Sequence, residues 1–477
     1  MKWTKRDTGL AIAITLIGGA VRFARLSSPH ALIGDEGFYA RDGCWYVEAS
    51  ARLCRTRGEL SPEHPPLGKW LIGSGIRVFG FNPFGWRFAA ALAGTLTVGL
   101  VYLLGKKILR STFGASVGSG LLAIDLLHVV QSRAAMLEVF VTLFVVAAFL
   151  FWAFDRERIA SQRHMPSDDP RIRGRRWRLA AGAAAGAAVA CKWSGVFVLL
   201  GLAGLTLFWE MKARGEAGIG SPFRCTLREE GPSLVAAFVV LPAIIYVGSY
   251  IGRIQGPIFV APWDRGSWAR TFVARQVKGM LLFHLHLQPS PSPYASPPWS
   301  WPLLKRPMTY YFSITPTGRY SDVLATGPPV WWLSIVALFT LAVQHVRRGR
   351  RRLLGPQGVI LGGFLCTYAP WLLLGYTRSL SFFFYIVPAV PFMCLAFGAV
   401  ASQIKGVVGR SVVGFILVGS MGLFVFYYPV LTGSPLSYDA WHARMLFTDC
   451  GSRISVGHDK VAPNLGPGPP PRGWCWI

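Results

Sequence analysis

The sequence predicts an all-α polytopic membrane protein with about 11 transmembrane helices and with amphipathic helices in two long outer loops. Of its 477 residues, 52% are hydrophobic and only 15% are charged, which is too apolar for a soluble protein of this size. The basic residues stand in short clusters between apolar runs that are long enough to cross a bilayer. The net charge of +27 is therefore interpreted as a topology signal, and no nucleic-acid partner is expected.

The first third of the chain alternates apolar runs with basic clusters. Three basic residues among the first six predict a cytoplasmic N-terminus, so a first span at 9–25 leads outward. It remains as an anchor, because no convincing cleavage site follows it. After an outer loop over 26–85, spans are expected at 86–105, 112–128 and 137–154. The last of these ends at a segment with eight arginines between Arg156 and Arg178, which is expected in the cytoplasm.

Residues 179–210 are too long for one ordinary span, and basic residues flank them on both sides. The positive-inside rule therefore favours two short crossings that meet near residues 191–194. Further spans are expected at 233–252, 329–346, 357–375, 383–403 and 411–430. This layout has 11 crossings, with the N-terminus inside and the C-terminus outside.

The predicted domain organisation is one transmembrane domain, residues 1–430, followed by a partly flexible extracytoplasmic tail, 431–477. The first outer loop, 26–85, holds six of the 22 acidic residues, whereas the second, 253–327, carries eight Lys and Arg against two acids. One loop thus supplies carboxylates and the other cations. No internal repeat is evident, which argues against a transporter built from duplicated halves.

The eight cysteines form no CxxC pair and have no histidine at metal-ligand spacing, so no metal site is assigned. Four of them fall in segments placed outside, where a disulfide is permitted: Cys44, Cys54, Cys450 and Cys475. Their pairing stays open.

Two stretches of the first outer loop carry candidate chemistry. Asp35 and Glu36 lie about ten residues past the first span, where a carboxylate can accept a proton from an attacking hydroxyl. Acids that stabilise a helix N-terminus explain the same pair without a function. Further on, His64 precedes two prolines and an amphipathic run over 67–80, which predicts a rigid turn before an interfacial helix. His64 is a candidate for sugar or phosphate binding, or is simply solvated.

Three ionisable residues are expected at or near membrane depth, where charges are costly and usually face a cavity or a partner. Arg133 and Glu138 lie at the outer boundary between the third and fourth spans. The planar guanidinium of Arg133 suits a lipid phosphate, and an ion pair with Glu138 is the alternative. Lys192 is the only charged residue between Arg178 and Glu210, where it either serves the site or extends to the interface.

The second outer loop combines imidazoles, aromatic rings and cations. Its candidate residues are His284, Tyr294, Trp299 and Arg306. This mixture suits a sugar phosphate at headgroup level, and an aromatic belt with lipid-facing cations is the alternative. His284 and His286 form an HxH pair without a third ligand, so metal binding is not expected from them.

Several of these stretches together resemble the protein O-mannosyltransferases in their short bacterial form, members of the C-type glycosyltransferase superfold. The resemblance covers roughly residues 10–440 and rests on the order of six motifs. They are Asp35-Glu36, His64-Pro65-Pro66-Leu67-Gly68-Lys69, Ser132-Arg133-Ala134-Ala135-Met136-Leu137-Glu138, Lys192-Trp193-Ser194-Gly195, Trp299-Ser300-Trp301-Pro302 with Arg306-Pro307, and Phe384-Tyr385-Ile386-Val387-Pro388-Ala389-Val390-Pro391-Phe392.

The resemblance implies about 11 spans, a cytoplasmic N-terminus and transfer of mannose from a polyprenyl-phosphate donor to Ser or Thr of exported proteins, with inversion at the sugar carbon. It implies Asp35 as catalytic base, with Glu36 supporting either the base or the acceptor. For donor-phosphate binding or active-site organisation it points to Arg133, Glu138, Lys192 and Arg306. The candidate sugar or acceptor contacts are His64, His284, Tyr294 and Trp299. No cofactor is required, and the residues leave open whether a divalent cation sits beside the acids.

Three departures from the family pattern concern acceptor choice and the arginine motif. Glu138 stands where the family usually has Asp, the region after Trp441 does not match, and 253–326 is too short for the soluble sugar-binding-like domain of eukaryotic relatives. The expected location is a bacterial plasma membrane with an extracytoplasmic site, where contact with membrane lipid and with the protein export machinery is anticipated. The alternatives are a related transferase that acts on a glycolipid or cell-wall glycan, a transporter or flippase, and a non-catalytic scaffold.

Overall fold

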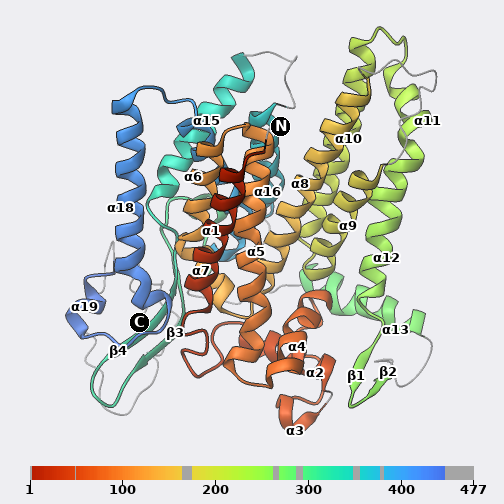
Figure 1. Cartoon of the computed structure of the whole chain (residues 1–477). Coiled ribbons are helices and arrows are strands. Elements are labelled where there is room, and N and C mark those ends of the chain that lie inside the picture. Colours follow the sequence, from red (N-terminus) through yellow and green to blue (C-terminus); the bar gives the residue numbers. More distant parts are fainter. Residues whose placement is uncertain are drawn as a thin grey trace.

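A computed structural model of the chain describes residues 3–48, 50–163, 175–260, 268–285, 294–347, 355–375 and 381–445. Long helices run side by side, and short helices and two β-hairpins gather at one end of the bundle (Figure 1). The helices of the bundle are α1 (Lys5–Phe23), α5 (Pro83–Leu109), α6 (Thr112–Ala123), α7 (Leu126–Arg133), α8 (Leu137–Arg163), α9 (Arg176–Cys191), α10 (Gly195–Glu216), α11 (Pro222–Val235), η1 (Ala236–Val240), α12 (Leu241–Gly248), α15 (Val330–Arg347), α16 (Pro356–Leu374), η5 (Phe383–Ala389), α17 (Val390–Ala401) and α18 (Val407–Leu431).

The remaining elements belong to the two outer loops and to the segment after α18. They are α2 (Glu36–Val47), α3 (Ala51–Cys54), α4 (Leu67–Phe79), β1 (Arg253–Gln255), β2 (Ile258–Val260), α13 (Trp268–Ala274), η2 (Arg275–Leu281), α14 (Leu282–Leu285), η3 (Pro298–Ser300), β3 (Met308–Ile314), β4 (Tyr320–Ala325) and α19 (Tyr438–His442). Strands β1 and β2 pair antiparallel, as do β3 and β4. Each outer loop therefore folds into compact elements at the same end of the bundle.

Each of the eleven predicted spans coincides with a helix or with a run of consecutive helices. Among the described residues, eight helices are long and apolar enough to cross a membrane, and the α6–α7 pair, bent by 55°, makes a ninth. The other two predicted spans correspond to α1 and α9, which pack against α5 and α8. Helices α9 and α10 meet at residues 192–194, where the basic flanks place the turn.

Burial separates central helices from peripheral ones. Of the apolar window of each span, 78% is buried in α8 and 89% in η5–α17, against 17% in α18. Side chains such as Phe415 and Val418 on α18 stand exposed, 79% and 72%. Apolar side chains outside a packed core are stable only against lipid, so α18 lies at the edge of the bundle.

A buried polar network and a disulfide stabilise the first outer loop and join it to the second. A Cys44–Cys54 disulfide links α2 to α3, whereas Cys450 and Cys475 lie outside the described residues. Lys69, on α4, is fully buried and donates to Glu59 over 2.7 Å. The other oxygen of Glu59 pairs with Arg275 of η2. This contact ties the two loops together.

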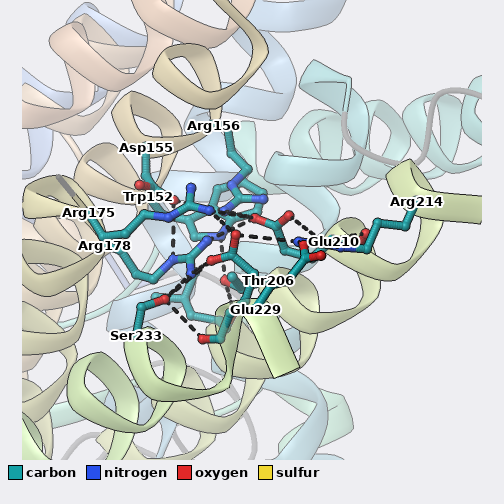
Figure 2. A network of polar contacts seen from close by, with 12 residues as sticks. Trp152, Asp155, Arg156, Arg175, Arg178, Thr206, Glu210, Arg214, Glu229 and Ser233 are labelled. Atoms are coloured by element: carbon teal, nitrogen blue, oxygen red, sulfur yellow. Dashed lines mark hydrogen bonds and ion pairs between the residues drawn. The ribbon is translucent and has the colours of Figure 1, made fainter. Parts of the chain in front are cut away.

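The opposite end of the bundle holds a network of buried charges on α8, α9, α10 and α11 (Figure 2). Arg178 lies at its centre and donates to Glu210 over 2.9 Å and to Glu230 over 2.6 Å. Glu210 also accepts from Arg214 over 2.9 Å, and Asp155 lies 3.5 Å from Arg178. Buried charges are stable only when they are paired, so the network holds the four helices in one arrangement.

Glu210→Gln is expected to lower the free energy of unfolding by about 3 kcal/mol, because Arg178 and Arg214 each lose one of their buried counter-charges and keep Glu230 as another. Glu229→Gln is the matched control, since this neighbouring carboxylate also pairs with Arg214 but its side chain is 60% exposed. Its loss should change stability by less than about 1 kcal/mol. Thermal unfolding of the purified variants measures the difference, and equal shifts would contradict the structural role of Glu210.

Candidate active site

Glu36 and Asp35 are adjacent in sequence but have different surroundings. Glu36 is fully buried at the start of α2, and both its oxygens accept from Arg87 of α5, over 2.8 and 2.9 Å. Further donors are Trp86 Nε1 and the backbone N–H groups of Ile33 and Ala135. With its acceptor sites occupied, Glu36 fastens the first outer loop to α5 and to the turn before α8.

Asp35 directly precedes Glu36, so the bonds of Glu36 also fix the position of the Asp35 carboxylate. It is half-buried and makes no side-chain bond to the N-terminus of α2, so the helix-capping interpretation does not apply to it. The hydroxyl of Tyr39, one turn further along α2, hydrogen-bonds to Asp35. Burial, followed by the nearby charge of Glu138, raises the pKa of Asp35 to about 6, while Lys192 opposes the shift. A carboxylate with a pKa this close to neutral is suited to general-base catalysis.

Lys192 and Glu138 form a buried ion pair beside Asp35. Lys192 follows the last residue of α9, in extended backbone, and Glu138 lies in the first turn of α8. The ammonium contacts Glu138 Oε1 and lies 4.3 Å from the centre of the Tyr385 ring. Glu138 Oε2 has no hydrogen-bond partner among the residues that the structure describes. A cation held this way next to a base is placed to meet an anionic group.

Arg133 is not paired with Glu138. Its guanidinium donates to backbone carbonyls at the end of α1, including those of Arg22 over 2.8 Å and Arg25 over 3.0 Å. The last carbonyls of a helix have no partner within the helix, so Arg133 satisfies them and fastens α7 to α1. Of its two predicted roles, this geometry favours active-site organisation, which stays a prediction.

Four rings from three separate segments form a row along the site. The ring of Tyr39 lies 5.7 Å from that of His64, which lies 6.4 Å from that of His284. The ring of Trp193, next to Lys192, lies 5.7 Å from that of His284. The two predicted histidines are therefore brought together, beside the helix that carries Asp35.

The other predicted residues of the second outer loop lie in the segment that leads into β3. Tyr294 is next to Asp322 of β4, and burial together with this carboxylate raises the pKa of Tyr294 to about 12. Trp299 is 52% exposed, with Lys305 over its ring. Arg306 is half-buried.

Several residues of the site were not singled out as candidates from the sequence. Tyr39 is four residues after Asp35 on a helix, a spacing that would have identified it. Tyr385 lies in a family-like motif to whose residues no function was assigned. No sequence pattern around Arg87 or Tyr310 indicates that they belong to the site. Tyr310 receives bonds from the backbone N–H of Gly34 over 3.0 Å and from the side chain of Gln131. Among the described residues, no group of three or more His, Cys, Asp or Glu is arranged to hold a metal ion.

Comparisons with known proteins agree with this architecture. A family model described as dolichyl-phosphate-mannose-protein mannosyltransferase matches residues 12–249, and one described as the C-terminal four TMM region of protein-O-mannosyltransferase matches residues 269–450. The chain is 31% identical to a polyprenol-phosphate-mannose–protein mannosyltransferase of Mycobacterium tuberculosis, over 92% of this chain and 90% of the relative. It is 30% identical to the protein of the same name from Mycolicibacterium smegmatis, over 91% and 90% of the two chains.

Among solved structures, the fold is similar to that of a Saccharomyces cerevisiae protein O-mannosyltransferase from the Pmt1–Pmt2 complex, with a TM-score of 0.72 and 15% identity over 93% of this chain and 92% of that one. ArnT from Cupriavidus metallidurans has a TM-score of 0.56 and 19% identity, over 88% of this chain and 65% of that one. The structural similarity shows the shared fold alone, because the sequence identities are below 20%, and the family follows from the sequence matches. The chain belongs to the protein O-mannosyltransferase family.

Proposed function

We infer that this chain is a membrane-embedded protein mannosyltransferase that uses polyprenol-phosphate mannose as its donor. Its family membership and the names of its mycobacterial relatives carry this conclusion. The finer assignment is that the acceptor is a Ser or Thr hydroxyl of an exported protein. It also places the reaction at the outer face of a bacterial plasma membrane.

The outer-face location is supported by charge and by the disulfide. Among the described residues, the basic residues in the last turns of α5, α10 and α15 lie at the end of the bundle opposite α2 and α4 (Figure 1). The Cys44–Cys54 disulfide suits an oxidising compartment. A lipid-linked mannose and a newly exported chain would meet at that face.

The proposed mechanism is a single inverting displacement, and one observation carries it: Asp35 is accessible with a raised pKa, while Glu36 is fully engaged by Arg87. Asp35 takes the proton of the acceptor hydroxyl as its oxygen attacks the sugar carbon. The bond from this carbon to the phosphate oxygen breaks, and the phosphate leaves as an anion without needing a general acid. Lys192 stabilises the charge that grows on the leaving oxygen.

The test uses the purified chain in detergent with radiolabelled polyprenol-phosphate mannose. A Ser/Thr-rich peptide is expected to become labelled, and a peptide with every Ser and Thr replaced by Ala is expected to stay unlabelled. Release of the label by β-elimination would identify an O-linked product. Label appearing on an added glycolipid while the peptide stays unlabelled would overturn the acceptor assignment.

His284→Ala is expected to raise the KM of donor or acceptor about three- to tenfold with kcat within twofold, because an aromatic contact contributes about 0.5–1.5 kcal/mol. His284 stands in the row of rings between His64 and Trp193, beside the helix that follows Asp35. Lys278→Ala, an exposed change on the preceding π-helix, is the control and should leave both constants unaltered. Equal kinetics for the two variants would remove His284 from the binding site.

A further inference from the structure

The hairpin of β3 and β4 has one edge paired and one edge unpaired. On the outer side of β4, Tyr320 exchanges both backbone bonds with Leu436, over 2.8 and 2.9 Å. The β3 partner of Tyr320 is Ile314, and two residues along, Asp322 faces Phe312. Alternate residues of an antiparallel pair present their N–H and C=O groups to opposite edges. Phe312 and Ile314 therefore direct theirs away from β4, and no backbone partner bonds them among the described residues.

This edge begins next to Asp35. The carbonyl of Tyr310, two residues before Phe312, accepts from the N–H of Gly34, the residue that precedes Asp35. Gly34 has a positive φ of 48°, and a side chain there would approach the Tyr310 ring to 3.2 Å, so glycine permits this close contact. At about 3.3 Å per residue, the edge runs about 13 Å outward from Tyr310 to Ile314.

Packing leaves the edge accessible in the part of the chain that the structure describes. β4 packs against α7 and α18, whereas the element that β3 mainly contacts is β4. Residues 311–314 of β3 are all half-buried rather than buried. Figure 1 shows the hairpin at the same end of the bundle as α2 and α4. Gly34, the residue before Asp35, thus already makes the first backbone bond that a third strand would make, to Tyr310. The next outward positions along β3, Phe312 and Ile314, are open.

We propose that the acceptor polypeptide binds in extended conformation as a third strand along the outer edge of β3, which carries its hydroxyl side chain to Asp35. This proposal rests on the proposed function and specifies how the acceptor is held. Backbone hydrogen bonds are common to every polypeptide and absent from a glycolipid or glycan, so an open strand edge that leads to the base favours a protein acceptor. The alternating side chains of the bound strand lie over and under the hairpin.

Ile314→Pro tests the edge with little effect on the hairpin. Proline removes one outward N–H, and the ladder with β4 keeps its bonds because that N–H does not belong to it. The peptide KM is expected to rise about tenfold, with the donor KM and kcat within twofold. Ile314→Ala is the matched comparison, since it removes the side chain but keeps the N–H, and its peptide KM should lie well below that of Ile314→Pro. Equal peptide KM values for the two variants would overturn the proposal.

Acceptor peptides methylated on alternate backbone nitrogens give an independent readout. Two peptides of one sequence carry the methyl groups on odd or on even positions relative to the modified residue. A bound strand turns only one of these sets toward β3, so one peptide should lose about tenfold or more in kcat/KM and the other should be accepted. Equal transfer to both would overturn strand binding alone, whereas no transfer to the unmethylated peptide would overturn the protein acceptor as well.

A second copy of the chain is the competing occupant of the edge. In that case Ile314→Pro would lower the molecular mass measured by light scattering and leave the peptide KM unchanged. This result would overturn the proposal. An unchanged mass together with the raised peptide KM supports it.

Discussion

Asp35→Asn is expected to reduce kcat/KM for mannosyl transfer by about 10²–10⁴-fold, because an amide cannot accept the proton of the attacking hydroxyl. The substitution keeps the shape of the side chain. Asp35 also makes no capping bond to α2, so the fold should be preserved. Transfer of labelled mannose to a peptide, measured alongside thermal unfolding, separates a loss of catalysis from a loss of structure.

Glu48→Gln is the matched control for this experiment. Glu48 is another carboxylate of the first outer loop, directly after α2, and it pairs with Arg77 at the surface. Its replacement should leave turnover within about twofold of wild type, as expected for an exposed pair. Full turnover by Asp35→Asn would exclude Asp35 as the base.

The pH dependence of the wild-type enzyme follows from the same residue. Burial and the charge of Glu138 raise the pKa of Asp35 to about 6. Only the deprotonated carboxylate is a base, so kcat/KM should rise as the pH increases through about 6 and should fall tenfold per unit well below it. If kcat/KM stays constant from about 1.5 pH units below this pKa to about 1.5 pH units above it, the assignment of Asp35 as the base is contradicted.

Lys192→Met is expected to lower kcat by about 10²–10³-fold, because the cation that meets the leaving phosphate is lost. The variant also leaves Glu138 buried without its counter-charge, which destabilises the protein. The double variant Lys192→Met/Glu138→Gln removes that penalty. It should unfold at nearly the wild-type temperature and yet remain inactive, whereas recovery of turnover would show that Lys192 acts only in folding.

The pH profile distinguishes a role of Lys192 in the site from a merely structural one. Its positive charge lowers the pKa of Asp35, and the negative charge of Glu138 raises it. The midpoint of kcat/KM should therefore move to higher pH in Lys192→Met and to lower pH in Glu138→Gln. Midpoints that shift in opposite directions would show that both charges act on Asp35. Identical midpoints in the two variants would show that the Lys192–Glu138 pair does not influence the pKa of Asp35.

Hydropathy and basic clusters were sufficient to predict the positions of the helices. A bilayer requires long apolar helices, and the orientation signal lies in short loops, so these properties are local in sequence. Helices α9 and α10 illustrate this, because the basic flanks alone predicted a turn near Lys192, although α10 continues to Glu216 and, with 22 residues, is not the short crossing that was expected. For α1 and α9, the crossing itself stays a prediction, since length and composition by themselves do not mark them as spans.

The family resemblance predicted Asp35 as the base and Glu36 as a supporting residue, but the contacts that separate the two carboxylates were not predicted. Glu36 is bound by Arg87, 51 residues away, and this contact supports the role proposed for Asp35. Arg133 likewise had two interpretations until its bonds to carbonyls at the end of α1, more than 100 residues away, were seen. No local pattern records such distant partners.

The sequence by itself determined that this chain crosses a membrane many times, which loops carry acids and cations, and which family its motifs resemble. The tertiary structure decided that Arg87 binds Glu36, that Lys192 pairs with Glu138, and that Tyr310 of β3 accepts from the N–H of Gly34. The division has a physical reason. Hydrophobicity and charge act through the bilayer on each segment separately, whereas hydrogen bonds and ion pairs depend on which distant segments pack together.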